Sequence, residues 1–158
     1  MTPDPEFLSR YREVRGASVA LVAGLDAEDC ALQSMPDASP QKWHLAHTTW
    51  FWETFVLGVA DPDYRPFDPR FRYLFNSYYN TVGEQFPRPS RGLVSRPSLA
   101  TVLAYRRHVD EAMERLAGRA APWPGPDARR WGGILALGLN HEQQHQELML
   151  TDLKHLWS

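Results

Sequence analysis

The feature that most constrains the fold is the spacing of the apolar residues, which recur every three or four positions along most of the chain. This spacing places apolar side chains on one face of an α-helix, whereas a half-buried strand would alternate apolar and polar residues. We therefore expect an all-α fold with four long helices, at about 5–25, 40–59, 97–117 and 127–158. Four long helices with one long connection are typical of a four-helix bundle.

Local signals predict where these helices begin and end. Gly24 is expected to end the first helix. Ser39 followed by Pro40 is typical of an N-cap and a first helical position. Asp127 is expected to cap the last helix after a proline-rich turn at 120–126. The last helix shows no stop signal before the end of the sequence, so we expect this domain to continue into something longer.

Residues 60–96 differ from the helical segments, because they contain five prolines and an aromatic-rich run. A connection of this length is usually functional or disordered, and the aromatic content argues against disorder. We therefore expect an ordered crossover between the second and third helices, with short helices inside it.

Length and charge place the chain among soluble single domains. Its 158 residues suit one domain, which we expect to span 1–158. The formal net charge of -2 gives no electrostatic reason to bind nucleic acid or an anionic membrane. No apolar run approaches the ~20 residues of a membrane span. The single cysteine, Cys30, cannot form an internal disulfide, which favours a cytoplasmic location.

The last predicted helix carries two histidines, His141 and His145, four residues apart. At ~3.6 residues per turn both project from one face, one turn apart. Two imidazoles at this spacing can reach a common metal ion. The same face carries apolar side chains, so it is expected to point into the bundle, where facing helices build metal sites.

A third ligand must come from another helix, and the second predicted helix offers two candidates. His47 lies in the middle of an inward face that includes Trp43 and Trp50, and His44 lies one turn earlier. We expect His47 to be the ligand, with His44 as a supporting residue or the replacement ligand. Three neutral imidazoles leave open coordination positions, which suit a catalytic zinc, iron or nickel ion.

Two glutamates beside these histidines need separate interpretations. With His141 and His145, Glu142 matches the His-Glu-x-x-His sequence pattern of zinc proteases. The two glutamines that follow it and the bundle context argue against protease activity. Glu147 is rotated by roughly 200° from His145 about the helix axis, at ~100° per residue. It is expected to support the site or the fold rather than bind the metal.

Three arginines, Arg88, Arg91 and Arg96, lie at the proline-stiffened end of the crossover. Guanidinium groups bind carboxylates through paired hydrogen bonds, so one interpretation is a clamp for an acidic substrate. The other interpretation is an exposed loop with ordinary surface charges. Both remain open at this point.

Four motifs occur in a fixed order along the chain: WHLAHTTWFWETF at 43–55, LFNSYYN at 74–80, Arg88-x-x-Arg91-Gly92, and His141-x-x-x-His145-x-Glu147-Leu148. Together they resemble the N-terminal DinB-like domain of the sulfoxide synthases of ergothioneine biosynthesis, to which the selenoneine synthases are related. The resemblance extends from about Leu8 to the end of the chain. It implies a DinB-like four-helix bundle whose long crossover joins helices two and three.

The resemblance also implies a reaction and a set of site residues. The family contains non-haem iron(II) oxidoreductases that use dioxygen to join γ-glutamylcysteine or cysteine to the imidazole C2 of Nα-trimethylhistidine as a sulfoxide. Three histidines would hold the iron, here His47, His141 and His145. An arginine pair would bind the carboxylates of the thiol, here Arg88 and Arg91. Gln144 would contact the histidine betaine.

The family's enzymes continue into a C-terminal formylglycine-generating-enzyme-like domain, which completes the active site. We therefore expect this chain to bind the metal and one substrate, and to need such a domain, fused or separate, for normal turnover. Two alternatives stay open. One is a stand-alone DinB-type transferase that uses zinc or nickel and a low-molecular-weight thiol, and the other is a non-catalytic docking module.

Overall fold

The computed structural model describes residues 5–77, 81–119 and 128–158. Every regular element in these residues is helical, which confirms the all-α prediction. In chain order the elements are α1 (Pro5–Ala20), η1 (Asp29–Ala31), α2 (Gln41–Trp52), η2 (Glu53–Leu57), α3 (Gly58–Ala60), α4 (Phe71–Leu74), η3 (Arg88–Leu93), α5 (Leu99–Ala117) and α6 (Ala128–Leu156). The predicted turn at 120–126, the Asp127 cap and the last three residues of the LFNSYYN motif lie outside the described residues.

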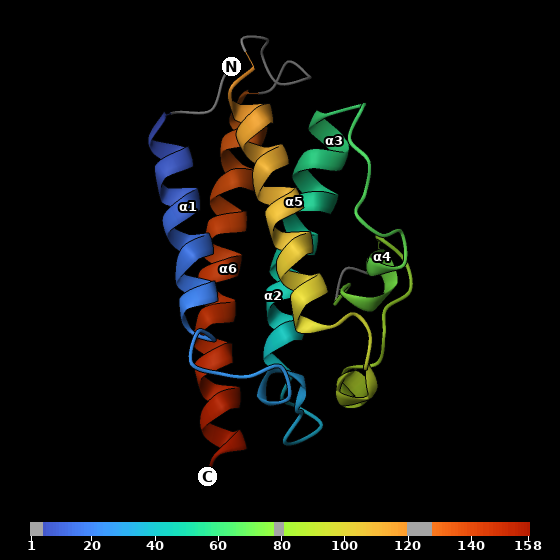
Figure 1. The fold of residues 1–158 in the computed structure, drawn as a ribbon. Helices are drawn as coiled ribbons and strands as arrows, with labels where there is room; N and C mark the ends of the chain where they lie inside the picture. The colour runs from blue at the N-terminus through green and yellow to red at the C-terminus, as the bar shows by residue number, and fades with distance from the viewer. Residues whose placement is uncertain (1–4, 78–80, 120–127) are drawn as a thin grey trace.

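The long helices α1, α2, α5 and α6 run side by side (Figure 1). Helix α2 packs against both α5 and α6, and α1 packs against α6. These helices share one hydrophobic core, whose largest buried side chains include Trp50, Trp52 and Tyr105. Every residue of α2 is buried, so the histidines of this helix lie in the interior of the molecule. No helix in the described ranges is long and apolar enough to cross a membrane.

Helix α6 approaches α2 closely at a glycine. A β-carbon added at Gly138 would lie 2.5 Å from the ring of Trp52, far inside van der Waals contact. The two helices can therefore meet here only because Gly138 has no side chain. Gly138 lies about one turn before His141, so this contact holds the histidine-bearing part of α6 against α2.

Two predicted helix ends need correction. The first helix ends at Ala20, about five residues before the predicted Leu25. In the turns that follow, hydrogen bonds span three residues instead of the four of an α-helix, as from Val22 N–H to Val19 O at 3.1 Å. Helix α2 begins at Gln41, and no side chain caps it. The extended backbone of Pro40 (φ −57°, ψ 145°) occupies the cap position instead.

The second predicted helix, at 40–59, is one continuous helical path through α2, η2 and α3, but η2 is a π-helical turn that the sequence pattern did not predict. Glu53, the first residue of η2, is buried and accepts hydrogen bonds from the hydroxyls of Tyr64 (2.6 Å) and Tyr105 (2.7 Å). This carboxylate joins the start of the crossover to α5. The crossover contains two short helices, α4 and η3, which confirms the prediction of short helices inside it.

The third predicted helix, at 97–117, is confirmed, although it begins two residues later than predicted, at Leu99. Helix α5 begins after Ser98, whose hydroxyl accepts a hydrogen bond from the Thr101 N–H at 3.2 Å, and it is capped at its other end by Gly118. Between α3 and α5 the crossover folds back onto α2, where Trp43 Nε1 donates to Leu74 O at 3.2 Å. This return places crossover residues beside the histidines of α2.

Candidate metal centre

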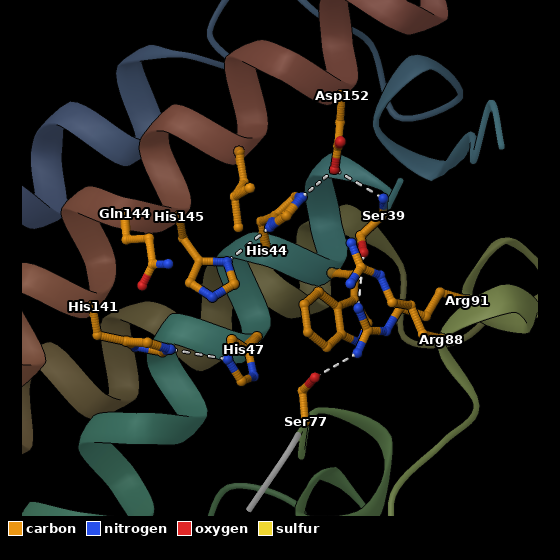
Figure 2. Close-up of a pocket in the computed structure, with 12 residues that line it drawn as sticks. Ser39, His44, His47, Ser77, Arg88, Arg91, His141, Gln144, His145 and Asp152 are labelled. Atoms are coloured by element: carbon orange, nitrogen blue, oxygen red, sulfur yellow. Dashed lines mark hydrogen bonds and ion pairs between the residues drawn. The ribbon is translucent and has the colours of Figure 1, made fainter. Parts of the chain in front are cut away.

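Three histidines from two helices meet in the interior. His47 comes from α2, and His141 and His145 come from successive turns of α6. Each offers one ring nitrogen, and these three atoms lie within 4.8 Å of one another. The Nε2 atoms of His47 and His141 are 3.1 Å apart (Figure 2). The structure thus brings together the three predicted ligands, in an arrangement that could hold a metal ion.

Burial keeps these imidazoles neutral. It lowers the pKa of His47 well below the ordinary value, and the neighbouring His141 lowers it further. Burial also lowers the pKa of His141, to about 4. The pKa of His145 is lowered by burial and by the adjacent His47 and His44. Neutral imidazoles are the form that binds metals, so the donor set fits a divalent cation near neutral pH.

A backbone carbonyl selects the tautomer of His47. Its Nδ1 lies 2.5 Å from the carbonyl oxygen of Phe75 in the crossover. A carbonyl oxygen can only accept a hydrogen bond, so Nδ1 carries the proton and Nε2 carries the lone pair. That lone pair faces His141, as a metal ligand requires, and a carbonyl partner of this kind is typical of metal-binding histidines.

His44 lies behind His145 rather than within the histidine cluster. Its Nδ1 is 2.9 Å from His145 Nδ1, and its Nε2 is 2.8 Å from Asp152 Oδ2. Both ring nitrogens are therefore engaged. Of the two roles left open for His44, the geometry favours the supporting one.

A cavity of about 230 Å³ opens beside the histidines. It is lined by residues of α2 and the segment just before it, of the crossover and of α6: Ser39, Trp43, His44, His47, Ser77, Arg88, Arg91, His141, Gln144, His145, Leu148 and Asp152. All three residues predicted to bind substrate are in this set. Arg96, the third arginine of the loop, is exposed and lies outside it.

Arg91 is built into the cavity wall. Only 4% of it is exposed, and its two terminal nitrogens donate to the hydroxyls of Ser39 and Ser77, each at 2.9 Å. Its guanidinium carbon lies 3.4 Å from the centre of the Trp43 ring, which in turn stacks on His47 at 4.6 Å between ring centres. Arg91 is therefore not a surface charge, and one indole separates it from a candidate metal ligand.

Arg88 reaches the same cavity from the start of η3. It donates to the carbonyl oxygen of Asp37, and its own carbonyl accepts from Gln33 Nε2 at 2.9 Å. Gln33 also accepts from the Gly92 N–H at 2.6 Å. A β-carbon at Gly92 would lie 2.9 Å from that of Gln33, which explains why a glycine follows Arg91 in the motif.

The two glutamates near the histidines do not serve the site. Glu142 is fully buried and turned toward α1 and α5, where it accepts from Arg106 (2.8 Å), Arg15 (3.1 Å) and Ser18 (2.8 Å). It does not line the cavity, so the geometry of a zinc protease is absent. Glu147 is exposed and also lies outside the cavity lining, so the structure shows no supporting contact from Glu147 to the site.

Sequence reasoning missed the supporting roles of Ser39, Ser77 and Asp152. Asp152 follows His145 by seven residues, two helical turns, so the sequence places it on the same inward face, but its contact with His44 was not predicted. No local signal could have found the two serines, because the arginine that they bind lies 52 and 14 residues away in the chain.

Fold and site together define an all-helical domain with a largely buried histidine cluster that lines an open cavity and could hold a metal ion. The family model of the DinB superfamily matches residues 10–149. The chain therefore belongs to the DinB superfamily, whose domains bind metal. A comparison with curated proteins finds no significant match.

Proposed function

We propose that this chain is the iron-binding domain of a non-haem, dioxygen-dependent sulfoxide synthase, which joins γ-glutamylcysteine or cysteine to Nα-trimethylhistidine in ergothioneine biosynthesis. One observation carries the proposal. A single cavity contains the three-histidine cluster, the arginine pair Arg88 and Arg91, and Gln144. A metal- and thiol-dependent transferase would need the histidines but not an arginine clamp for carboxylates.

The arginine clamp, Arg88 and Arg91, would bind the carboxylates of the thiol. Arg91 is already fixed by two serine hydroxyls and by the Trp43 ring. Its orientation is thus set before substrate arrives, which reduces the entropy lost on binding. Gln144 is exposed on the cavity side of α6, where its amide can both donate to and accept from the histidine betaine.

The three histidines would hold iron(II), which when bound supplies the redox chemistry that activates dioxygen. The overall reaction balances without an external reductant. The thiol loses its S–H hydrogen, the imidazole loses its C2 hydrogen, and a C–S bond forms. One oxygen atom of dioxygen becomes the sulfoxide oxygen, and the other leaves as water with the two hydrogens.

The fold and location follow the same proposal. Helices α1, α2, α5 and α6 would form the four-helix bundle of one DinB-like domain spanning 1–158, with the crossover between α3 and α5. A formylglycine-generating-enzyme-like domain, fused or separate, would complete the active site. Cys30 is a free buried thiol, which supports a reducing, cytoplasmic location.

The test is dioxygen consumption by the iron(II)-loaded chain with γ-glutamylcysteine or cysteine and Nα-trimethylhistidine, with and without a formylglycine-generating-enzyme-like domain. We expect consumption and sulfoxide formation that need all three substrates and are strongly increased by the second domain. Arg88→Ala should weaken thiol binding, and Arg96→Ala, an exposed arginine outside the cavity, is the matched control. Tight zinc binding with no response to Nα-trimethylhistidine would instead identify a transferase.

A further inference from the structure

A chain of three side chains runs from the surface of the cavity to one candidate ligand. Asp152 Oδ2 lies 2.8 Å from His44 Nε2, and His44 Nδ1 lies 2.9 Å from His145 Nδ1 (Figure 2). All three residues are at least nine-tenths buried. His44 lies on α2, and the other two residues lie on α6. These hydrogen bonds therefore also join the two helices that carry the histidine cluster.

The proton positions in this chain follow from its acidic end. Asp152 Oδ2 also accepts from the Ser39 N–H at 2.9 Å, so this oxygen is an acceptor and His44 Nε2 carries a proton. A neutral imidazole has one donor and one acceptor nitrogen, so His44 Nδ1 carries the lone pair. The facing nitrogen, Nδ1 of His145, must then donate. The remaining nitrogen of His145, Nε2, therefore carries a lone pair.

We propose that His44 and Asp152 are positioning residues that fix the tautomer and ring orientation of His145, so that its Nε2 lone pair is available to the metal. This inference rests on the proposed metal-binding function. Hydrogen bonds from carboxylates to metal-binding histidines are known to act in this way. Here a second imidazole is inserted between the carboxylate and the ligand.

The two candidate ligands His47 and His145 have their tautomers fixed by different kinds of hydrogen-bond partner. His47 is fixed by a rigid backbone carbonyl, that of Phe75. His145 is fixed by side chains, and these connect further, because Ser39 donates its N–H to Asp152 while its hydroxyl accepts from Arg91. Substitution can therefore remove the support of His145 without altering the backbone.

The probe is Co²⁺ alone, titrated into the full chain, with affinity and visible absorption spectrum as readouts. His44→Phe removes the acceptor while keeping an aromatic ring, and we expect affinity to fall about 10–100-fold with a changed spectrum. His44→Asn is the conservative rescue, because its side-chain oxygen lies near the position of Nδ1 and can accept from His145. It should recover most of the lost affinity and the wild-type spectrum.

Asp152→Ala tests the far end of the chain and should also weaken Co²⁺ binding. Asp152 acts through His44, so the two losses should not add. The double variant, Asp152→Ala with His44→Phe, should bind Co²⁺ no more weakly than whichever single variant has the lower affinity. His155→Phe is the control, since His155 is exposed on the same helix and its imidazole contacts the Ser34 hydroxyl rather than any residue of the cavity. It should leave both readouts unchanged.

The outcomes separate the inference from the function beneath it. If the wild-type chain binds no Co²⁺, the metal-binding function itself fails. If the wild type binds but His44→Phe keeps its affinity and spectrum, or His44→Asn fails to rescue, or the double variant shows additive losses, the positioning role is overturned. Complete loss of binding in both folded His44 variants would make His44 a ligand. Should His44→Phe not fold, weakened binding by Asp152→Ala with near-normal binding by His44→Asn supports the proposal.

Discussion

The buried carboxylate of Glu142 provides the sharpest test of how the bundle is held together. Glu142 is fully buried and receives two guanidinium groups, from Arg15 on α1 and Arg106 on α5. Burial raises its pKa, but the two arginines outweigh this effect and lower the pKa to about 2. The carboxylate is thus a charged junction between three helices.

Glu142→Gln keeps the shape of the side chain but removes its charge. One carboxylate oxygen accepts from Ser18 and Arg106, and the other accepts from Arg15 and Trp52. A glutamine amide must place its NH₂ group against one of these donor pairs. Breaking a buried ion pair on one side typically costs about 3–5 kcal/mol, a large part of the ~5–15 kcal/mol that stabilises a domain.

The assay is urea denaturation followed by tryptophan fluorescence, together with thermal melting. We expect the free energy of unfolding to fall by about 3–5 kcal/mol and the melting temperature to fall by roughly 6–20 °C, at about 2–4 °C per kcal/mol. Glu147→Gln, exposed on the same helix, should stay within about 0.5 kcal/mol. A folded Glu142→Gln variant with unchanged stability but no activity would refute this reasoning and point to a catalytic base.

Three further predictions follow from the helix contact and the cavity. Gly138→Ala should lower the free energy of unfolding by about 1–3 kcal/mol, because its methyl group meets the ring of Trp52, whereas Gly133→Ala, with open space around it, should be neutral or stabilising in the same urea titration. His141→Ala should abolish stoichiometric metal binding, measured by elemental analysis after dialysis, and retained metal would show that the ligand assignment is wrong. Arg91→Lys should weaken thiol binding about tenfold or more, measured by calorimetry, because the hydrogen bonds of a charged group contribute about 1.5–3 kcal/mol each. The metal content should stay unchanged. Equal affinity for the thiol would contradict the arginine clamp.

The sequence predicted the histidine cluster because its key information is local. His141 and His145 are one helical turn apart, and His47 lies in the middle of the inward face that includes Trp43 and Trp50. The all-α fold followed from the same periodicity. Helix ends were less predictable, since Ala20 and Gln41 are set by backbone hydrogen bonds and by Pro40 rather than by residue type alone.

What could not be predicted depends on pairs that are distant in the chain. Glu142 lies 127 residues from Arg15 and 36 from Arg106. Its place in the sequence matches the zinc-protease pattern, but its carboxylate pairs with these two distant arginines. The π-helical turn η2 was not predicted either, and its first residue, Glu53, meets hydroxyls from α5 and the crossover that no local signal indicates.

The stack of Arg91, Trp43 and His47 has a consequence for how the two halves of the site are spaced. Arg91 arrives on the crossover and His47 on α2, yet the indole ring between them contacts both. The separation of the positive charge from the candidate ligand is therefore set by the thickness of an aromatic ring. A rigid spacer of this kind makes the distance independent of the length of the crossover, and any replacement of Trp43 would change the charge position and the ligand position together.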